Sequence, residues 1–263
     1  MADKQTGTGK HKRAAKSHMD RAAEMEERGR FREAISELEK AVRTATDKPL
    51  VYRELAELYR SQRQMDEAID AIKQVIKHEP NDLQAREMLL EMLIELGRFD
   101  DAIRESKDLL KVSPRNLSAR DVLSIAYLQK GMLDKALQVT NELVRLDPTS
   151  ATNYFKRALL YQQKGDYGNA INEYSRVLEM HPDDEMAEDA QQAIDSLDSY
   201  QLRHIVMLAV EDYIFRAKLI RDPESAARER GYYLSYSGMS ALKQIQFDEL
   251  PEVYNEWKQR YYH

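Results

Sequence analysis

The side chains that most often carry catalysis or bind metals are sparse in this chain, and their spacing suits neither task. There is no cysteine among the 263 residues, which removes thiol catalysis, disulfides and Cys-ligated zinc together. The six histidines stand at 11, 18, 78, 181, 204 and 263, and no two are three or four residues apart, the spacing at which one helix presents two metal ligands. We therefore expect no metal site.

Two other features could suggest chemistry, and neither has the surroundings that chemistry needs. The sequence GTGK near the start lacks the rest of a phosphate-binding loop, and no strand is predicted before it. Carboxylates are so numerous, with 46 Asp and Glu, that their proximity says nothing about acid–base catalysis. We expect a non-enzymatic protein with no catalytic residues and no cofactor.

A period of 34 residues organises most of the chain. Alanine recurs at one phase, and glycine recurs five residues earlier, with Arg63 in the second glycine position. The alanines are Ala34, Ala68, Ala102, Ala136 and Ala170, and the glycines are Gly29, Gly97, Gly131 and Gly165. A period of this length predicts an array of stacked units, and such arrays commonly present a binding surface.

The repeated residue types predict a helix, a turn and a second helix in each unit. Large apolar residues open the second helix, as at Phe31, and follow at offsets of four and eleven, which lie on one helix face. The alanine within this stripe lets the paired helices approach closely. Glycine ends the first helix in the left-handed conformation, so Arg63 predicts a strained turn or a different one. Proline ends the second helix at Pro80, Pro114, Pro148 and Pro182, with Pro49 three residues late.

These phases resemble those of the tetratricopeptide repeat, a helix–turn–helix unit of 34 residues. The stretch NYFKRALLYQQKGDYGNAINEYSRVLEMHP is the copy most similar to the family pattern. The resemblance covers residues 15–184 and implies an all-α fold, a right-handed α–α superhelix. It further implies that the inner face of the superhelix holds a peptide or a helix of another protein.

Four segments are expected along the chain. Residues 1–14 predict a disordered basic arm, residues 185–199 a capping helix, and residues 200–263 a helical, tyrosine-rich extension. Between arm and cap lie the five repeats, 15–48, 49–82, 83–116, 117–150 and 151–184.

Within the extension we expect a helix over about 200–220 with a single buried stripe that runs from Leu202 through Tyr213 and Ile214 to Ile220. Asp222 and Pro223 predict the start of the next helix and Gly231 its end, and further helices are predicted over about 237–246 and 251–262. The extension could pack on the last repeats and on itself, mediate docking or self-association, be partly disordered, or fold back along the groove.

Composition bounds the class of partner and the compartment. The charged fraction of 33% and the mean hydropathy of −0.70 suit a thin, two-layer helical array. No stretch has the length and apolar character of a membrane span or a signal peptide, so a cytoplasmic protein without membrane contact is expected. The net charge of −6 argues against nucleic acid as a partner, although residues 1–20 hold five Lys or Arg against two Asp.

The resemblance also implies which residues meet a ligand, because in this family the ligand contacts the first helix of each pair. The implied groove residues are Glu54, Glu57, Glu87, Glu91, Asp121, Val122, Ile125, Leu128, Phe155, Lys156 and Leu159. Glu26 and Glu95 add to the acidic part. This groove is acidic along its first three repeats and largely apolar along the last two, so we expect a peptide or helix that is basic at one end and apolar at the other.

The function expected from these observations is a protein-interaction adaptor or scaffold. Solvated helix faces are often rich in Glu, so the acidic part could also be ordinary surface. Two alternatives stay open: a structural subunit that self-associates through residues 200–263, and a targeting module for an activity located in those residues. The oligomeric state is not determined by the sequence.

Overall fold

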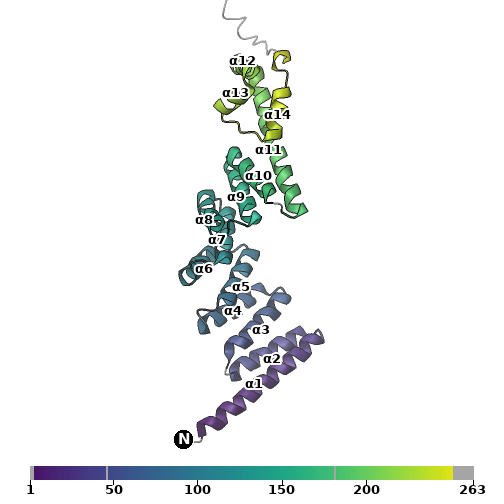
Figure 1. Ribbon diagram of the computed structural model, residues 1–263. Helices are drawn as coiled ribbons and strands as arrows, with labels where there is room; N and C mark the ends of the chain where they lie inside the picture. The colour runs from purple at the N-terminus through teal and green to yellow at the C-terminus, as the bar shows by residue number, and fades with distance from the viewer. Residues whose placement is uncertain (1–2, 46, 181, 251–263) are drawn as a thin grey trace, which may run out of the picture. The chain divides into compact units, whose positions relative to one another are not determined.

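The computed structural model describes residues 3–45, 47–180 and 182–250, and all the regular elements in these ranges are helices (Figure 1). The chain forms two compact units that follow one another in sequence, the first ending at Met132 and the second beginning at Leu133. The predicted helix over 251–262 lies outside the described residues. The all-α class expected from the periodicity is confirmed.

The first unit contains three helix pairs and the first helix of a fourth. Its helices are α1 (Asp3–Glu27), α2 (Phe31–Thr44), α3 (Lys48–Ser61), α4 (Met65–His78), α5 (Leu83–Glu95), α6 (Phe99–Val112) and α7 (Leu117–Gln129). Each helix packs against the next along the chain, and α7 also contacts α5 (Figure 1). Second helices begin at Phe31, Met65 and Phe99, as the apolar phase predicts.

The turns inside the pairs share one backbone conformation, including the turn that lacks glycine. Gly29, Gly97 and Gly131 have φ values of 72°, 68° and 69°, and Arg63 has φ 59°. In each turn the residue after this position donates its N–H to a carbonyl five residues back, at 2.8 Å for Gln64 to Tyr59. Arg63 therefore adopts the glycine turn, at the steric cost that a Cβ brings in the left-handed region.

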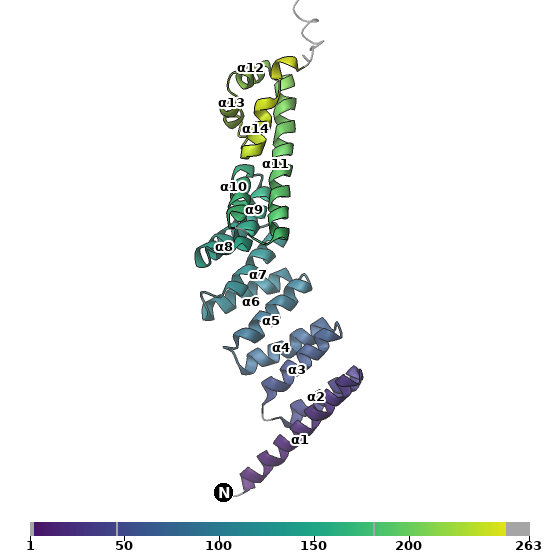
Figure 2. The same ribbon diagram turned by 45° about the vertical axis from the view of Figure 1, so that its right-hand side comes forward.

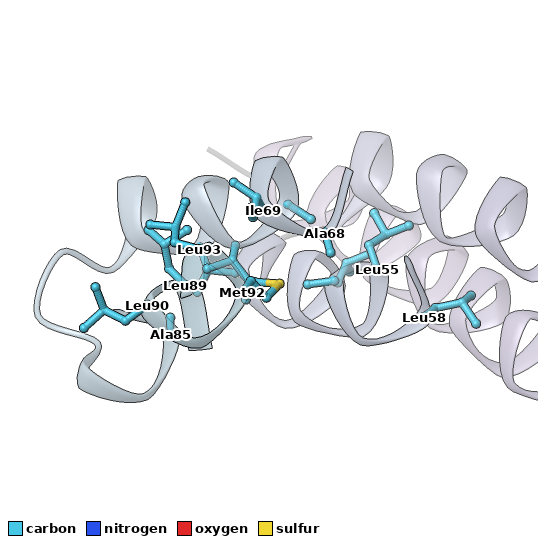
Figure 3. Close-up of a cluster of buried hydrophobic side chains, with 14 of the residues drawn as sticks. Leu55, Leu58, Ala68, Ile69, Ala85, Leu89, Leu90, Met92 and Leu93 are labelled. Carbon is cyan, nitrogen blue, oxygen red and sulfur yellow. The ribbon is translucent and has the colours of Figure 1, made fainter. Parts of the chain in front are cut away.

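The repeated alanines lie where the helices of a pair meet. Ala34, Ala68 and Ala102 have no accessible surface. Figure 3 shows Ala68 and Ile69 of α4 among Leu55 of α3 and the leucines of α5, so successive pairs contribute to one continuous core. A larger side chain at the alanine phase would have to displace a neighbouring helix.

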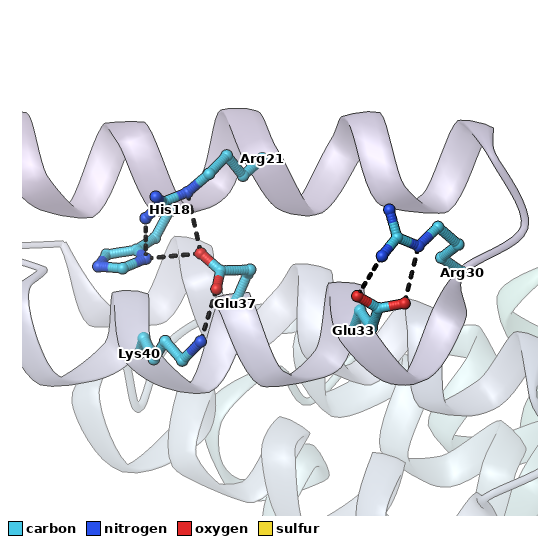
Figure 4. Close-up of polar contacts among 6 residues, drawn as sticks. All are labelled: His18, Arg21, Arg30, Glu33, Glu37 and Lys40. Carbon is cyan, nitrogen blue, oxygen red and sulfur yellow. Dashed lines mark hydrogen bonds and ion pairs between the residues drawn. The ribbon is translucent and has the colours of Figure 1, made fainter.

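A polar cluster joins α1 to α2 at the start of the array. The buried carboxylate of Glu37 is 2.8 Å from His18 Nδ1, 3.0 Å from Arg21 Nε and 2.6 Å from Lys40 Nζ (Figure 4). The hydrogen bonds from Lys40 and then His18 lower the pKa of Glu37 to about 2. The Glu33 carboxylate in the same view pairs with Arg30, and both of these side chains are exposed.

Helix α1 extends further toward the N-terminus than the sequence analysis expects. It begins at Asp3, so residues 3–14, expected as a disordered arm, are helical. Lys, Arg and Ala predominate over 10–16, and these residues have high helix propensity, so the helix of the first pair continues backwards without a stop.

The second unit begins with one helix of the fourth pair and continues through the fifth pair into the extension. Its helices are α8 (Leu133–Leu146), α9 (Ala151–Lys164), α10 (Tyr167–Glu179), α11 (Asp184–Glu211), α12 (Tyr213–Arg221), α13 (Pro223–Glu229), α14 (Tyr236–Gln244) and the 3-10 turn η1 (Phe247–Glu249). Ala136 and Ala170 are fully buried, and Gly165 turns with φ 79°. The last repeat therefore has the geometry of the earlier ones.

Helix α11 does not end where the capping helix was expected to end. It runs without interruption for 28 residues, past the predicted boundary between 199 and 200. Ala190, Ile194 and Leu197 in its first half are buried with α10, whereas Ile205 and Ala209 in its second half are buried with the extension. Figure 2 shows α11 beside α10 at one end and beside α14 at the other.

The predicted stripe over 200–220 is correct up to residue 209 and wrong after it. Asp212 ends α11 and caps α12 by accepting a hydrogen bond from Phe215 N at 2.9 Å. The helical phase restarts at this break, so Phe215 and Leu219 are buried in place of Ile214 and Ile220. Tyr213 and Ile214, expected inside, have 69% and 53% of their surface exposed.

The rest of the described extension agrees with its predicted helix signals. Asp222 caps α13, Pro223 occupies its first turn, and Gly231 follows its end with φ 81°. Two buried polar side chains of α11 then hold the returning chain. Gln201 donates to Tyr233 O at 2.8 Å and accepts from Tyr233 N at 2.9 Å, while Asp198 accepts from Ser235 N at 2.9 Å. The extension thus packs on α11 and on itself.

Candidate binding surface on the first helices

The groove residues expected from the sequence come from the first helix of each pair, and they lie in both units. Glu54, Glu57, Glu87 and Glu91 stand on α3 and α5, and the residues from Asp121 to Leu128 on α7. Phe155, Lys156 and Leu159 stand on α9 of the second unit. The two groups are therefore separate parts of the candidate surface.

Three carboxylates, Glu26 of α1 and Glu54 and Glu57 of α3, lie close enough for the charges of Glu26 and Glu57 to act on Glu54. Glu54 is half-buried, and its pKa is raised, first by burial and then by the like charges of Glu57 and Glu26. Glu57 is exposed. Among the described residues, neither Glu54 nor Glu57 has a hydrogen-bond or ion-pair partner. We refer to Glu26, Glu54 and Glu57 together as the acidic cluster. Such a site attracts a cation because bringing one in relieves the mutual repulsion of the carboxylates.

Arginines of α3 neutralise the carboxylates on the neighbouring α5 side. Arg60 lies 2.7 Å from Glu95 and 3.7 Å from Glu91, and Arg53 lies 3.0 Å from Glu79 and also pairs with Asp82. Glu87 accepts a hydrogen bond of 2.7 Å from Asn116 Nδ2. The acidic part of the predicted groove therefore has two kinds of carboxylate. Glu91 and Glu87 have polar partners, whereas Glu54 and Glu57 of the acidic cluster have none among the described residues.

Of the predicted groove residues on α7, one is buried in the core and three are half-buried. Val122 has only 7% of its surface exposed and belongs to the core, so its assignment to the groove is wrong. Helix α7 contacts both α5 and α6, which buries a wider face than one partner helix would. Asp121, Ile125 and Leu128 are half-buried, so part of each side chain reaches the surface.

The α9 residues of the second unit differ in how much they offer to a ligand. Phe155 packs edge-on against Tyr174, with ring centroids 5.3 Å apart, and so contributes to the core as well as to the surface. Lys156 is half-buried, and Leu159 has 39% of its surface exposed. Of the apolar groove residues, Leu159 is the one exposed side chain in the described part of the chain.

The sequence analysis missed the polar residues that fix these helices. Arg157 on α9 makes two hydrogen bonds to Glu173, of 2.8 and 2.7 Å, and one to Asn141 of 3.0 Å. A half-buried ion pair thus joins α9 to α10, and a hydrogen bond joins α9 to α8. Arg60 has the same kind of role between α3 and α5. Their one sequence-level clue is an arginine on a first helix with a carboxylate in the adjacent helix, a pattern too common in this chain to stand out.

Neither a metal centre nor a bilayer-spanning segment is evident in the described ranges. They hold no gathering of three or more His, Asp or Glu side chains that could ligate a metal ion. None of their helices combines the length and the apolar composition that crossing a membrane requires.

Stacked helix pairs with carboxylates on the exposed side of the first helices define a helical-repeat protein. Three family models, each described as a tetratricopeptide repeat, match residues 26–92, 88–151 and 123–195, and together they run from 26 to 195 without a gap. The chain belongs to the tetratricopeptide repeat family.

Solved structures with the same fold are similar to this chain at low identity. MamA residues 41 to the end, from Desulfovibrio magneticus RS-1, superposes with a TM-score of 0.54 at 20% identity, covering 64% of this chain and 95% of that one. YrrB, described as a TPR protein with an unusual peptide-binding site, gives a TM-score of 0.54 at 18% identity, covering 66% of this chain and 90% of that one. No curated protein matches the sequence. At these identities the likeness establishes the fold alone.

Proposed function

We propose that this protein is a non-enzymatic adaptor that captures a basic peptide or helix of another protein on the first helices of its repeats. The observation that carries the proposal is the acidic cluster, because burial and the like charges of Glu57 and Glu26 raise the pKa of Glu54, and no cation of the described residues pairs with Glu54 or Glu57. A lysine or arginine of a ligand would supply the missing charge. Membership of a repeat family whose members bind proteins supports the same function.

The ligand proposed for the second unit is apolar. Leu159 is exposed on α9, and the half-buried Phe155 lies on the same helix one turn earlier. An aliphatic or aromatic side chain would bury this surface and gain roughly 25 cal/mol per Å². A partner with basic and apolar segments therefore fits the two parts of the surface separately.

Affinity capture from the native cell tests the acidic part of the proposal. The variant is Glu54→Lys with Glu57→Lys, which reverses two exposed or half-buried charges without touching the core. The matched control is Asp66→Lys with Asp100→Lys, two exposed carboxylates in the first turns of second helices. We expect a set of proteins retained by the wild type and the control and lost by the variant. Identical retention by all three chains would remove the acidic cluster as a ligand site.

The apolar part needs a variant that leaves the core intact. Leu159→Lys is suitable because the side chain is exposed, whereas Phe155→Glu would disturb the contact with Tyr174. We expect Leu159→Lys to weaken binding of whichever partner the first experiment captures, measured with purified proteins. Unchanged affinity would restrict the proposal to the first unit.

Self-association through the extension is a second candidate, favoured by a specific observation. The break at Asp212 leaves Tyr213, Ile214 and Ile220 exposed on α12, and such side chains often mark contact surfaces. Sedimentation of the wild type beside Ile214→Lys distinguishes this candidate from a monomeric adaptor. A wild-type oligomer that the substitution dissociates would favour the structural-subunit function.

A further inference from the structure

A pocket of about 390 Å³ opens in the first unit between α2, α3 and α4, away from the surface discussed above. Helical offsets of three and four place its residues on one face of each helix. The lining residues are Glu39, Val42 and Arg43 of α2, Tyr52, Leu55 and Tyr59 of α3, and Glu67, Asp70, Ala71 and Gln74 of α4. We refer to it as the tyrosine pocket.

The tyrosine pocket and the acidic cluster use opposite faces of α3. With about 100° between consecutive residues of a helix, Tyr52, Leu55 and Tyr59 share one direction. Glu54 and Glu57 point roughly the opposite way. A ligand in the tyrosine pocket is therefore a second ligand, and its binding does not depend on the function proposed for the first helices.

The pocket combines an apolar floor with aromatic walls. Leu55 and Ala71 are buried and form the floor together with the half-buried Val42. Tyr52 stacks on His78, with centroids 6.3 Å apart and planes 20° apart, which steadies one wall. Tyr59 forms another, and its hydroxyl donates a hydrogen bond of 3.2 Å to Glu39 Oε1. Both rings present surface on which a flat side chain can stack.

The rim of the tyrosine pocket is negatively charged. Three carboxylates, Glu39, Glu67 and Asp70, line it beside one cation, Arg43. Burial, followed by the charges of Glu39 and then Glu67, raises the pKa of the Tyr59 hydroxyl, so the field inside opposes a further negative charge. In the described part of the chain Glu67 and Asp70 have no hydrogen-bond or ion-pair partner, whereas Asp66, which precedes Glu67 in the sequence, pairs with Arg98.

We propose that the tyrosine pocket receives an arginine side chain of a partner protein. Its planar guanidinium would stack on a tyrosine and present donors to the rim carboxylates, while its aliphatic stem covers the apolar floor. An acidic side chain would meet like charge, and a wholly apolar one would desolvate the carboxylates without pairing them. The volume lies at the small end for ligand pockets, which suits one side chain more than a cofactor.

Nuclear magnetic resonance on the full isotope-labelled chain tests this assignment with defined probes. The first probe is a short peptide with one arginine between two leucines, and the second is the same peptide with citrulline, which keeps the shape and removes the charge. We expect the arginine peptide to shift the amide signals of Tyr52, Tyr59 and Ala71, and to bind about fivefold more tightly than the citrulline peptide.

Two charge-neutral variants locate the binding. Glu67→Gln with Asp70→Asn should weaken the arginine peptide about fivefold and leave the thermal midpoint of the chain near the wild type. If this double substitution destabilises α4, Asp70→Asn alone tests the same charge with a smaller perturbation. The matched control, Asp66→Asn with Asp100→Asn, removes two exposed carboxylates outside both sites and should bind as the wild type does. The amide signals that shift separate the two sites, because Tyr52, Tyr59 and Ala71 line the tyrosine pocket and do not belong to the acidic cluster.

Several results would overturn the assignment. They are the absence of shifts at these residues, equal affinity for the two peptides, and binding that the control weakens and the pocket variant does not. A further one is self-association of the chain, seen by sedimentation without peptide and lost in the pocket variant. That result would mean that a second copy of this protein, and not a different partner, binds in the tyrosine pocket.

Discussion

The paired helices of the first unit and the extension of the second unit solve the same problem, burial of an amphipathic helix, in different ways. In the first unit each helix is covered by its neighbours in sequence, and fully buried alanines set the contact at a constant phase. In the extension a single helix, α11, supplies a face on which α12 and α14 pack, and no phase repeats.

This difference shows that a sequence period predicts the environment of a residue inside the repeats and does not predict it in the extension. In a repeat the position of one alanine predicts the environment of the next, because each unit meets the same neighbours. In the extension the environment of a residue depends on capping and chain reversal at particular places, above all Asp212 and the pairing of Gln201 with Tyr233. The following variants test this comparison, beginning with the largest expected effect.

Phe215→Ala should cost about 3–5 kcal/mol of stability in the extension, because it empties a fully buried position. Hydrogen exchange should show the loss in α12 to α14, while the amides of the first unit keep their protection. Tyr213→Ala, two residues away and exposed, should change stability by less than about 0.5 kcal/mol. If both variants change stability by the same amount, the claim that the break at Asp212 buries Phe215 and exposes Tyr213 is wrong.

Ala102→Leu should cost about 1–3 kcal/mol through overpacking between α5 and α6. The loss should appear in the chemical unfolding of the first unit, followed by circular dichroism. Ala23→Leu, at an exposed position of α1, is the control and should be neutral. An unchanged unfolding midpoint for Ala102→Leu would show that the alanine phase does not set the spacing of the helices.

Glu37→Gln should lower stability by about 1–2 kcal/mol at neutral pH, since the half-exposed Arg21 and Lys40 retain solvent screening. The folded-state pKa of Glu37, about 2, lies below its ordinary value of 4.5. The contribution is therefore complete above pH 4.5 and is lost as the pH falls toward 2. The gap in thermal midpoint between wild type and variant should close over that interval.

The exposed pair formed by Glu33 and Arg30 supplies the control for this pH dependence. Glu33→Gln should have little effect on the thermal midpoint at either end of the interval, because the side chains of both Glu33 and Arg30 are solvated. A gap for Glu37→Gln that persists unchanged at the acid end would contradict the role of Glu37 as an ionised anchor between α1 and α2.

The smallest effect expected comes from the turn without glycine. Arg63→Gly should stabilise the chain by up to about 1 kcal/mol, because it relieves the left-handed arginine at φ 59° and the entropy cost of glycine offsets part of the gain. Gly97→Arg, the reverse exchange in the next repeat, should destabilise it by a similar amount. Both changes are measurable by calorimetry, and effects of the same sign would mean that the two turns are not equivalent.

The sequence predicted the repeats closely because their residues act locally. The apolar phase marks the start of each second helix, and the glycine phase marks the left-handed turn, even where Arg63 replaces glycine. The end of α11 is not predicted, because the sequence analysis continues one apolar stripe through Asp212, although Asp is among the preferred residues at the start of a helix.

The candidate surface was harder to predict, because contact with other helices decides which residues of a first helix stay exposed. Val122 is buried since α7 touches two helices, and Glu91 is neutralised by Arg60 from a different repeat. The tyrosine pocket had no sequence clue, since its residues are spread over 36 positions on three helices and become neighbours only after packing.

The continuity of α11 also has a consequence for how the second unit can be divided. A protease cut anywhere along residues 184–211 would take side chains from the last repeat or from the extension, since one rod serves both. Neither fragment would keep all of its former interior. A chain that ended with the periodic region would therefore expose the apolar side chains of the last repeat that α11 covers.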